Sequence, residues 1–168
     1  MRRREFLFAS AAVGAGMAGS PQKKEPPLRT GSFEGTICLF SKHLPEMNWH
    51  ELAQATQRAG FGGVDLTVRP AGHVLPERAR EDLPKAVTAI RAAGLTVPMI
   101  TTELISGSAP AAQGILSTAG ELRIPFFKPG YYAYEFVDVR RELKQAGAQL
   151  HGLVELARSC GVQCGPQP

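Results

Sequence analysis

Short apolar runs alternate with amphipathic stretches along most of the chain. The apolar runs begin near residues 36, 64, 96, 124 and 162. The second run, from Gly63 to Val68, lies between Gly62 and Pro70, which is typical of a buried strand. The stretches between the runs carry apolar residues at helical spacing. Alternation of this kind predicts an α/β protein of about four βα units and the start of a fifth strand, with parallel strands and right-handed crossovers.

The clearest strand–helix–strand unit lies at the centre of the chain. Its first strand, residues 63–68, precedes a helix whose N-cap we expect to be Asp82, with Pro84 in the first turn. Gly94 follows the last apolar position of this helix and is predicted to end it. Residues 95–101 then read as the next strand, so the unit predicts a parallel pair of strands.

Three further helices are predicted on either side of this unit. Asn48 is expected to cap the first, with Glu51 placed for a capping box. A weaker helix is expected over residues 111–121, where glycines lower the helix propensity. The longest helix is expected to begin after Asp138 and to end at Gly161.

The N-terminal part has a different composition from the rest. The run Arg3-Arg4-Glu5-Phe6-Leu7 matches the core of a twin-arginine export signal, so residues 1–20 are predicted to be such a signal and to direct the chain to the periplasm or beyond. A basic disordered N-terminus is the alternative. The apolar part of this segment is too short to span a bilayer, so no stable membrane anchor is expected. Residues 21–34 read as a proline-rich linker, and residues 35–168 as the folded domain.

Charge and length narrow the possibilities further. The net charge is +4, and Arg2, Arg3 and Arg4 less Glu5 account for half of it. No basic run with interleaved aromatic residues is present, so we expect no nucleic-acid partner. At 168 residues the chain suits one domain, but a complete eight-fold β/α barrel needs about 250 residues.

The three cysteines give no strong signal. Cys38, Cys160 and Cys164 are odd in number, and we interpret them as small buried apolar residues. A disulfide between Cys160 and Cys164 would need unusual local geometry, and a zinc site would lack further ligands.

Two segments carry a resemblance to a known family. The segments VRPAGHVLPE (68–77) and VPMITT (97–102), with a basic residue, a glycine and two tyrosines after the fourth strand, resemble the sugar phosphate isomerase/epimerase family of xylose isomerase-like barrels. The likeness covers about residues 36–165 and is strongest to a bacterial, exported branch. It implies a partial (β/α) TIM barrel that corresponds to the N-terminal half of the family.

The resemblance also implies a chemistry. Family members move a proton next to a sugar carbonyl, with a divalent metal that polarises the substrate and two glutamates as acid–base groups. The family's metal ligands come mainly from its later strands. In related exported sequences a Tyr-His-Asn-His segment follows the position of Gly165, where this chain has Pro166-Gln167-Pro168. We therefore expect a truncated member that lacks the metal-binding half, with no metal site or other cofactor in this chain.

Candidate site residues follow from the barrel geometry, because active sites lie at the carboxyl ends of barrel strands. Basic side chains there can hold a phosphate, a carboxylate or a hydroxyl group, and tyrosines can stack on a sugar ring. Lys128 is the strongest candidate, because a lysine that ends an apolar strand is costly to bury unless it faces a polar mouth. The histidines are alternatively exposed loop residues, and Glu103 alternatively caps a helix. The predicted substrate-binding residues are Arg69, His73, Glu103, Lys128 and Tyr132, chosen from a set that also held Lys42, His43 and Tyr131.

Asp65 lies inside a strand and needs a partner whichever face it occupies, so a structural salt bridge and a site role both stay open. No catalytic residue is assigned.

Three functions are compatible with these observations. The first is a sugar phosphate isomerase or epimerase by descent, with a small sugar or sugar phosphate as its ligand. The second is an exported, non-catalytic module that binds a sugar or another partner. The third is an open flavodoxin-like sheet, for which no glycine-rich phosphate loop follows the first strand. A partial barrel would also leave sheet edges and an inner apolar face open to self-association.

Overall fold

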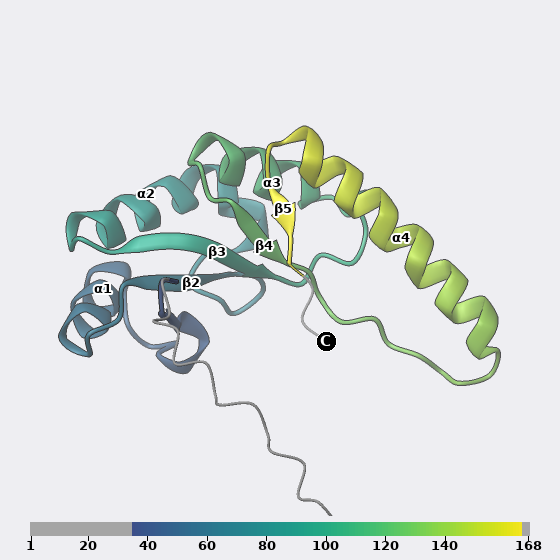
Figure 1. The fold of residues 1–168 in the computed structure, drawn as a ribbon, viewed down its shortest axis with the longest axis horizontal. Coiled ribbons are helices and arrows are strands. Elements are labelled where there is room, and N and C mark those ends of the chain that lie inside the picture. The colour runs from purple at the N-terminus through teal and green to yellow at the C-terminus, as the bar shows by residue number, and fades with distance from the viewer. Residues whose placement is uncertain (1–34, 166–168) are drawn as a thin grey trace, which may run out of the picture. The chain divides into compact units, whose positions relative to one another are not determined.

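The computed structural model describes residues 35–165. They form one sheet of five parallel strands with a helix after each of the first four (Figure 1). The strands are β1 (Cys38–Phe40), β2 (Gly63–Val68), β3 (Thr96–Thr102), β4 (Phe126–Lys128) and β5 (Gln163–Cys164). The helices are α1 (Trp49–Arg58), α2 (Ala79–Ala92), α3 (Ala112–Glu121) and α4 (Val139–Ser159), with 3₁₀ turns η1 (Ser41–His43) and η2 (Pro76–Arg78).

The predicted α/β class is confirmed, and each strand begins within two residues of its expected start. The predicted export signal and linker, residues 1–34, lie outside the described residues, as do residues 166–168. No helix in the described part of the chain is long and apolar enough to cross a membrane.

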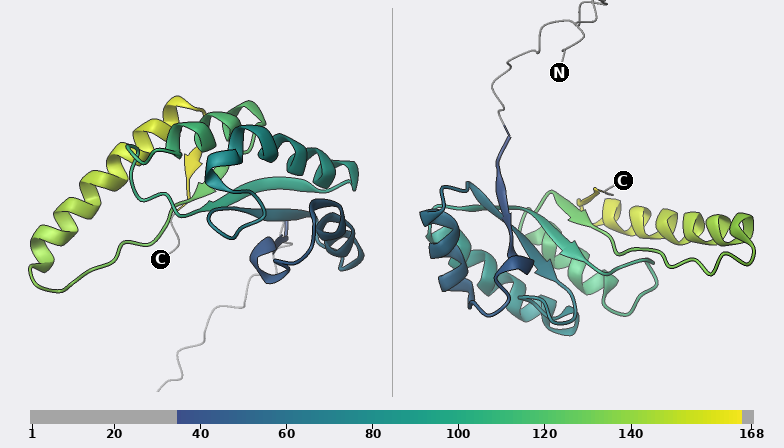
Figure 2. Two further views of the ribbon diagram at one scale, coloured as in Figure 1. Left: turned by 180° about the vertical axis from the view of Figure 1, so that it is seen from behind. Right: turned by 90° about the horizontal axis from the view of Figure 1, so that it is seen from below.

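The strands pair in the order of the sequence, β1-β2-β3-β4-β5, and every pair is parallel. A flavodoxin-like sheet has the order 2-1-3-4-5, so that alternative is wrong. Sequential parallel strands joined by helices are the arrangement of a β/α barrel wall. Helices α2 and α3 cover one face of the sheet (Figures 1 and 2), with α1 packed on α2 and α4 packed on α3.

The core lies between this sheet face and the helices. On β2, Val64, Leu66 and Val68 are fully buried and alternate with residues that point to the other face. The bulk of the core comes from the sheet-facing sides of α2 and α3, together with Ile100 and Phe127. The alternation leaves the opposite face of the sheet, here called the inner face, to Asp65, Thr67 and their neighbours.

A bulge in β3 sets which of its residues reach the inner face. Gly63 pairs with Thr96 and Asp65 pairs with Met99, so β3 takes three steps where β2 takes two. Because of the extra residue, Val97 and Ile100 both face the core. Pro98 lies within the bulge, a position that tolerates the missing amide proton. Beyond the bulge the register is regular, and Thr101 pairs with Thr67 on the inner face.

The predicted start of α1 is confirmed. The side chain of Asn48 accepts hydrogen bonds from the backbone nitrogens of His50 and Glu51, at 3.0 and 3.1 Å. The Glu51 carboxylate accepts in return from the Asn48 nitrogen at 2.9 Å, which completes the capping box. Gly60 follows the helix with a φ of +81°, a conformation that glycine adopts without strain.

The predicted start of α2 is wrong. The helix begins at Ala79, directly after turn η2, and Asp82 lies inside its first turn. Burial explains the earlier start, because Ala79 is only 1% exposed and extends the core-facing stripe toward the N-terminus. The Asp82 carboxylate pairs with Arg78 at 2.6 Å and with Lys85 at 3.4 Å instead of capping. Pro84 therefore falls in the helix interior, where it removes one backbone hydrogen bond.

Helix α4 begins as predicted. Asp138 accepts a hydrogen bond from the Arg141 nitrogen at 3.0 Å. The Glu142 carboxylate accepts four more from the backbone nitrogens of residues 135–138, at 3.0–3.2 Å. These bonds favour the charged form and lower the pKa of Glu142. One carboxylate therefore holds the segment that leads into the helix.

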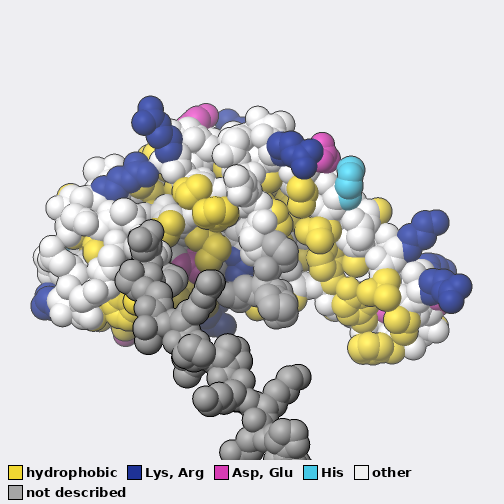
Figure 3. Space-filling view, in the orientation of Figure 1, with side chains coloured by type: hydrophobic (Ala, Val, Ile, Leu, Met, Phe, Trp, Pro, Cys, Tyr) yellow, Lys and Arg dark blue, Asp and Glu magenta, His cyan; other side chains and the backbone are white. Residues whose placement is uncertain are grey.

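The N-terminal half of α4 extends beyond the sheet (Figures 1 and 2). Only Leu153 and Ala157 of this helix are fully buried. Figure 3 shows hydrophobic side chains gathered at its free end. The exposed ones include Phe136, Val137, Val139 and Leu143.

Candidate functional site

A hollow of about 370 Å³ lies at the carboxyl ends of the strands. The first four strands and the loops that follow them supply its wall, as the parallel sheet predicts. The lining mixes polar and apolar residues, and three of its side chains are basic. The lining residues are Phe40, Lys42, Arg69, Thr101, Thr102, Glu103, Ile105, Lys128, Gly130 and Tyr131.

Lys128 is the last residue of β4, and it points into this hollow because its neighbour Phe127 faces the core. In the described part of the chain it is the only charged residue counted as buried, at 8% exposed. Its Nζ donates a hydrogen bond to the Tyr131 hydroxyl at 2.8 Å and lies 4.4 Å from the centre of that ring. A cation on an aromatic face is stabilised there, so the ring and the hydroxyl offset part of the cost of burial.

Asp65 lies on the inner face of β2, and its partner is a hydroxyl group. Thr101 Oγ1 lies 2.9 Å from both carboxylate oxygens. Burial raises the pKa of Asp65, while the Thr101 hydrogen bond and the positive charge of Lys128 act in the opposite direction. A structural salt bridge and a site role were both open for Asp65 from the sequence, and its hydrogen-bond partner in the structure is the Thr101 hydroxyl.

Arg69 and Glu103 face each other across the same hollow. Arg69 Nη1 lies 3.6 Å from Glu103 Oε1, and the side chains are 22% and 55% exposed. Arg69 Nε is buried and has no hydrogen-bond partner among the described residues. The guanidinium is thus loosely paired and keeps donor capacity for another group.

His73 has a different place from the one its sequence position suggested. It is not among the residues that line the hollow, and both of its ring nitrogens contact protein oxygens. Nδ1 lies 3.2 Å from Thr67 Oγ1, and Nε2 lies 3.2 Å from the carbonyl oxygen of Leu44. Burial lowers the pKa of His73. The ring therefore joins the loop after β1 to the end of β2.

A buried hydroxyl chain continues from His73. The Ser41 hydroxyl, which is fully buried, lies 3.1 Å from Thr67 Oγ1 and accepts from the Thr67 nitrogen at 2.9 Å. Because a carbonyl only accepts, His73 Nε2 must carry the ring proton and donate to Leu44. Nδ1 then accepts from Thr67, and Thr67 accepts from Ser41, so every hydroxyl proton has one acceptor.

The two adjacent tyrosines separate. Tyr131 lines the hollow, whereas the Tyr132 hydroxyl donates to the carbonyl of Ile105 at 2.7 Å and its ring lines another groove, beside α4. The Lys128 hydrogen bond, followed by the charge of Lys128, lowers the pKa of Tyr131. Burial raises the pKa of Tyr132. Tyr132 was the predicted substrate-binding tyrosine. The signal for Tyr131 is its position three residues after Lys128, a separation that its hydroxyl spans to reach Nζ.

The described residues do not fit the divalent metal that the family resemblance implies. Residues 35–165 contain no group of three or more His, Cys, Asp or Glu side chains that could hold a metal ion. The three cysteines are free, and each is partly buried, where full burial was expected.

Comparison with known proteins supports the fold. Neither a family model nor a curated protein matches the sequence. Among solved structures, a D-psicose 3-epimerase from Clostridium cellulolyticum H10, determined with D-tagatose, matches with a TM-score of 0.59 at 12% identity, covering 77% of this chain and 51% of that one. A 3-keto-D-glucoside 4-epimerase from E. coli matches at 0.60 and 14% identity, covering 79% and 56%.

A xylose isomerase-like TIM barrel protein from Mycobacterium smegmatis, determined in complex with magnesium, matches at 0.57 and 14% identity, covering 78% of this chain and 54% of that one. The chain therefore spans about half the length of these structures. At such identities the likeness is one of fold. The five parallel strands and their helices have the fold of part of a β/α barrel wall.

Proposed function

We propose that the chain binds a small sugar or sugar phosphate in the hollow at the strand ends, as a relative of the sugar isomerases and epimerases. The observation that carries the proposal is Lys128, a buried cation directed into the hollow at the place where barrel proteins bind ligands. The solved structures of similar fold include two sugar epimerases, one of them determined with a ketose.

The side chains around the hollow suit a polyhydroxylated ligand. Arg69 and Lys128 supply charged donors for a hydroxyl, carboxylate or phosphate oxygen, and such bonds contribute about 1.5–3 kcal/mol each. Glu103 supplies an acceptor for hydroxyl protons. The exposed ring of Tyr131 offers an apolar surface for the face of a sugar.

The proposal for residues 35–165 is binding, with no step assigned to a metal, because these residues hold no ligand cluster for one. The same observation favours a second candidate, a non-catalytic sugar-binding module. Metal-dependent epimerisation of D-tagatose by the purified chain would overturn that second candidate and leave sugar binding in place.

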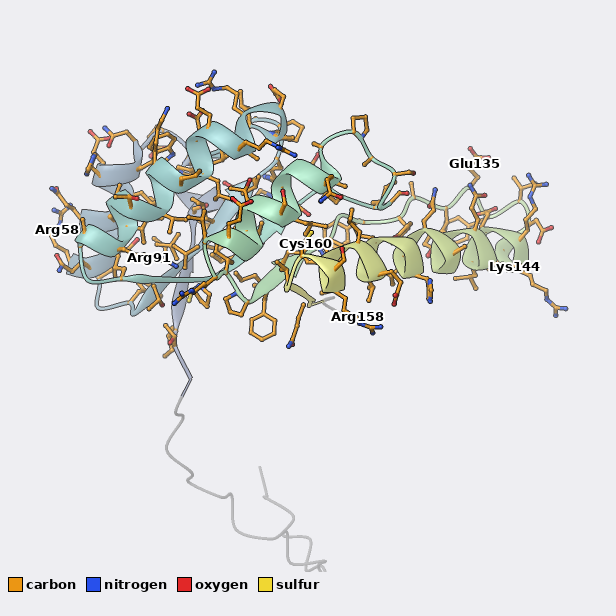
Figure 4. All side chains as sticks on the ribbon, turned by 90° about the horizontal axis from the view of Figure 1, so that it is seen from above. Arg58, Arg91, Glu135, Lys144, Arg158 and Cys160 are labelled. Carbon is orange, nitrogen blue, oxygen red and sulfur yellow. The ribbon has the colours of Figure 1, made fainter. Side chains whose placement is uncertain are left out.

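Isothermal titration of the purified chain with D-tagatose and with a ketose phosphate tests the binding proposal. We expect Lys128→Met to weaken binding about tenfold or more, the effect of losing one charged hydrogen bond. Lys144→Met is the matched control, because Lys144 lies on the projecting helix α4 (Figure 4). No binding to a folded chain, or equal loss in both variants, would refute the proposal.

Export by the twin-arginine route and self-association through the inner face are separate proposals. The first is supported by the run Arg3-Arg4-Glu5-Phe6-Leu7. The second is supported by Phe126, which is 40% exposed and is the first residue of β4, whereas Lys128 is its last. It is also supported by β1 and β5, which are the edge strands of the sheet. Sedimentation of the purified domain as a monomer would contradict the second.

A further inference from the structure

We infer that Lys128 is a nucleophilic amine that forms a reversible imine with the open-chain carbonyl of a sugar in the hollow, with Tyr131 moving the protons. The inference rests on the proposed sugar binding and goes beyond it, because it adds a covalent bond and names the reacting atoms.

The position of the amine is fixed by the sheet. Lys128 pairs with Thr101 in the register of β3 and β4. Its carbonyl oxygen accepts a hydrogen bond from Thr102 Oγ1 at 2.8 Å. Thr101 and Thr102 of β3 thus both contact the backbone of Lys128. The side chain therefore extends into the hollow from a rigid strand. A reacting group on a rigid strand end costs less to orient than one on a loop.

The amine has a proton-transfer partner within hydrogen-bond reach. Tyr131 Oη lies 2.8 Å from Lys128 Nζ, and the pKa of Tyr131 is lowered by that contact and by the nearby charges of Lys128 and Lys42. A phenol of lowered pKa exchanges its proton more readily near neutral pH. Tyr131 is also accessible to a ligand, because the residue is 78% exposed and lines the hollow.

The reaction balances with these two groups and solvent water. Lys128 first gives one ammonium proton to solvent, and its free amine then adds to the carbonyl carbon. The oxygen that becomes negative takes the Tyr131 phenol proton. The nitrogen then returns a proton to the phenolate, which gives a neutral carbinolamine. The phenol protonates the carbinolamine hydroxyl, water leaves, and the products are a protonated imine, water and the Tyr131 phenolate. Hydrolysis reverses every step, and no oxidant or reductant is needed.

The surroundings accommodate the product. The protonated imine carries the same single positive charge as the resting ammonium group of Lys128, and the negative charge that appears is on the Tyr131 phenolate beside it. Asp65, which is hydrogen-bonded to Thr101, supplies a nearby carboxyl group. The positive charge of Lys128 lowers the pKa of Asp65, whereas burial raises it. Exposed Lys85 serves as a reference lysine, because its ammonium group is paired with Glu81 at 3.1 Å and with Asp82 at 3.4 Å.

Reductive trapping of the full chain tests the inference. The protein is incubated with dihydroxyacetone and sodium cyanoborohydride, which converts an imine into a stable secondary amine, and the modified lysines are located by peptide mass mapping. We expect the adduct at Lys128 to form faster than at Lys85 and Lys144, and D-tagatose to slow it by competition. Lys128→Arg should remove this adduct and leave the others.

Tyr131→Phe gives the sharper test, because it keeps the exposed ring and removes only the hydroxyl. We expect it to slow labelling at Lys128 by about 10²-fold, the lower range for acid–base catalysis, with Lys85 and Lys144 unchanged. Tyr132→Phe is the matched control, since its hydroxyl is bonded to the backbone outside the hollow.

Equal labelling of all three lysines in the wild-type chain, or the same rate at Lys128 in Tyr131→Phe, would overturn the inference. Binding of D-tagatose without an adduct at Lys128 would overturn the imine and leave the proposed function standing. Absence of both binding and adduct would overturn the two together.

Discussion

Replacing His73 by alanine should destabilise the fold and change how its stability depends on pH. The ring joins Leu44 to Thr67 through two contacts of 3.2 Å, and it ends the hydroxyl chain that begins at Ser41. Removing the ring deletes two hydrogen bonds, worth about 1 kcal/mol each, and leaves the Thr67 hydroxyl proton in need of an acceptor. We expect the free energy of unfolding at pH 7.5 to fall by about 2–3 kcal/mol.

The pH dependence follows from the same contacts. Burial lowers the pKa of His73 below its ordinary value of 6.5. Between the lowered pKa and 6.5 the unfolded chain binds a proton that the folded chain does not, so stability falls as the pH falls through this window. The contribution of neutral His73 is fully present above pH 6.5. The alanine variant should lack this part of the slope, because nothing at position 73 then titrates.

Urea unfolding followed by tryptophan fluorescence measures both effects. Trp49 is the only tryptophan in the chain, and its Nε1 donates a hydrogen bond to the His73 carbonyl at 2.9 Å. Its fluorescence therefore reports on the structure around His73. His151→Ala on the exposed face of α4 is the control. The reasoning is refuted by a loss no larger than that of the control, or by parallel pH profiles of the wild type and His73→Ala.

Three other changes have defined outcomes. Because burial raises the pKa of Asp65, ionisation of its carboxyl group lowers the stability of the fold as the pH rises through that pKa. The urea midpoint of the wild type should therefore increase relative to that of Asp65→Asn when the pH is lowered from 7 to 4. A difference between the two midpoints that does not change with pH would contradict this. Glu142→Gln should speed amide hydrogen exchange at residues 135–138, because their backbone nitrogens donate four hydrogen bonds to the Glu142 carboxylate. Unchanged exchange at these residues would show that the carboxylate does not stabilise the segment. Arg3→Lys with Arg4→Lys should abolish export to the periplasm in cell fractionation, and continued export would exclude the twin-arginine route.

Much of the fold is encoded in local sequence patterns. Helical and strand periodicity depends on residues a few positions apart, so the order of elements and their approximate ends could be predicted. The capping box at Asn48 and the cap at Asp138 are equally local, and both are confirmed. The start of α2 was predicted wrongly, because the burial of Ala79 depends on packing against the sheet, which no local pattern expresses.

The site was only partly predictable. Parallel strands bring their carboxyl ends together, so Arg69, Glu103 and Lys128 could be selected from the sequence, and they line one hollow. Which of two neighbouring tyrosines turns toward Lys128 depends on the path of the loop. His73 was selected by position alone, and its ring nitrogens are occupied by groups from Thr67 and Leu44.

By itself the sequence determined the class of fold, the parallel order of units and the set of polar residues at the strand ends, because each of these follows from local spacing. Only the tertiary structure decided the bulge in β3, the pairing of Asp65 with Thr101 across 36 positions and the placement of the Tyr131 hydroxyl on Lys128. The physical reason is register: which side chains meet across two strands depends on how the strands align, and a single extra residue changes the face that every later side chain occupies.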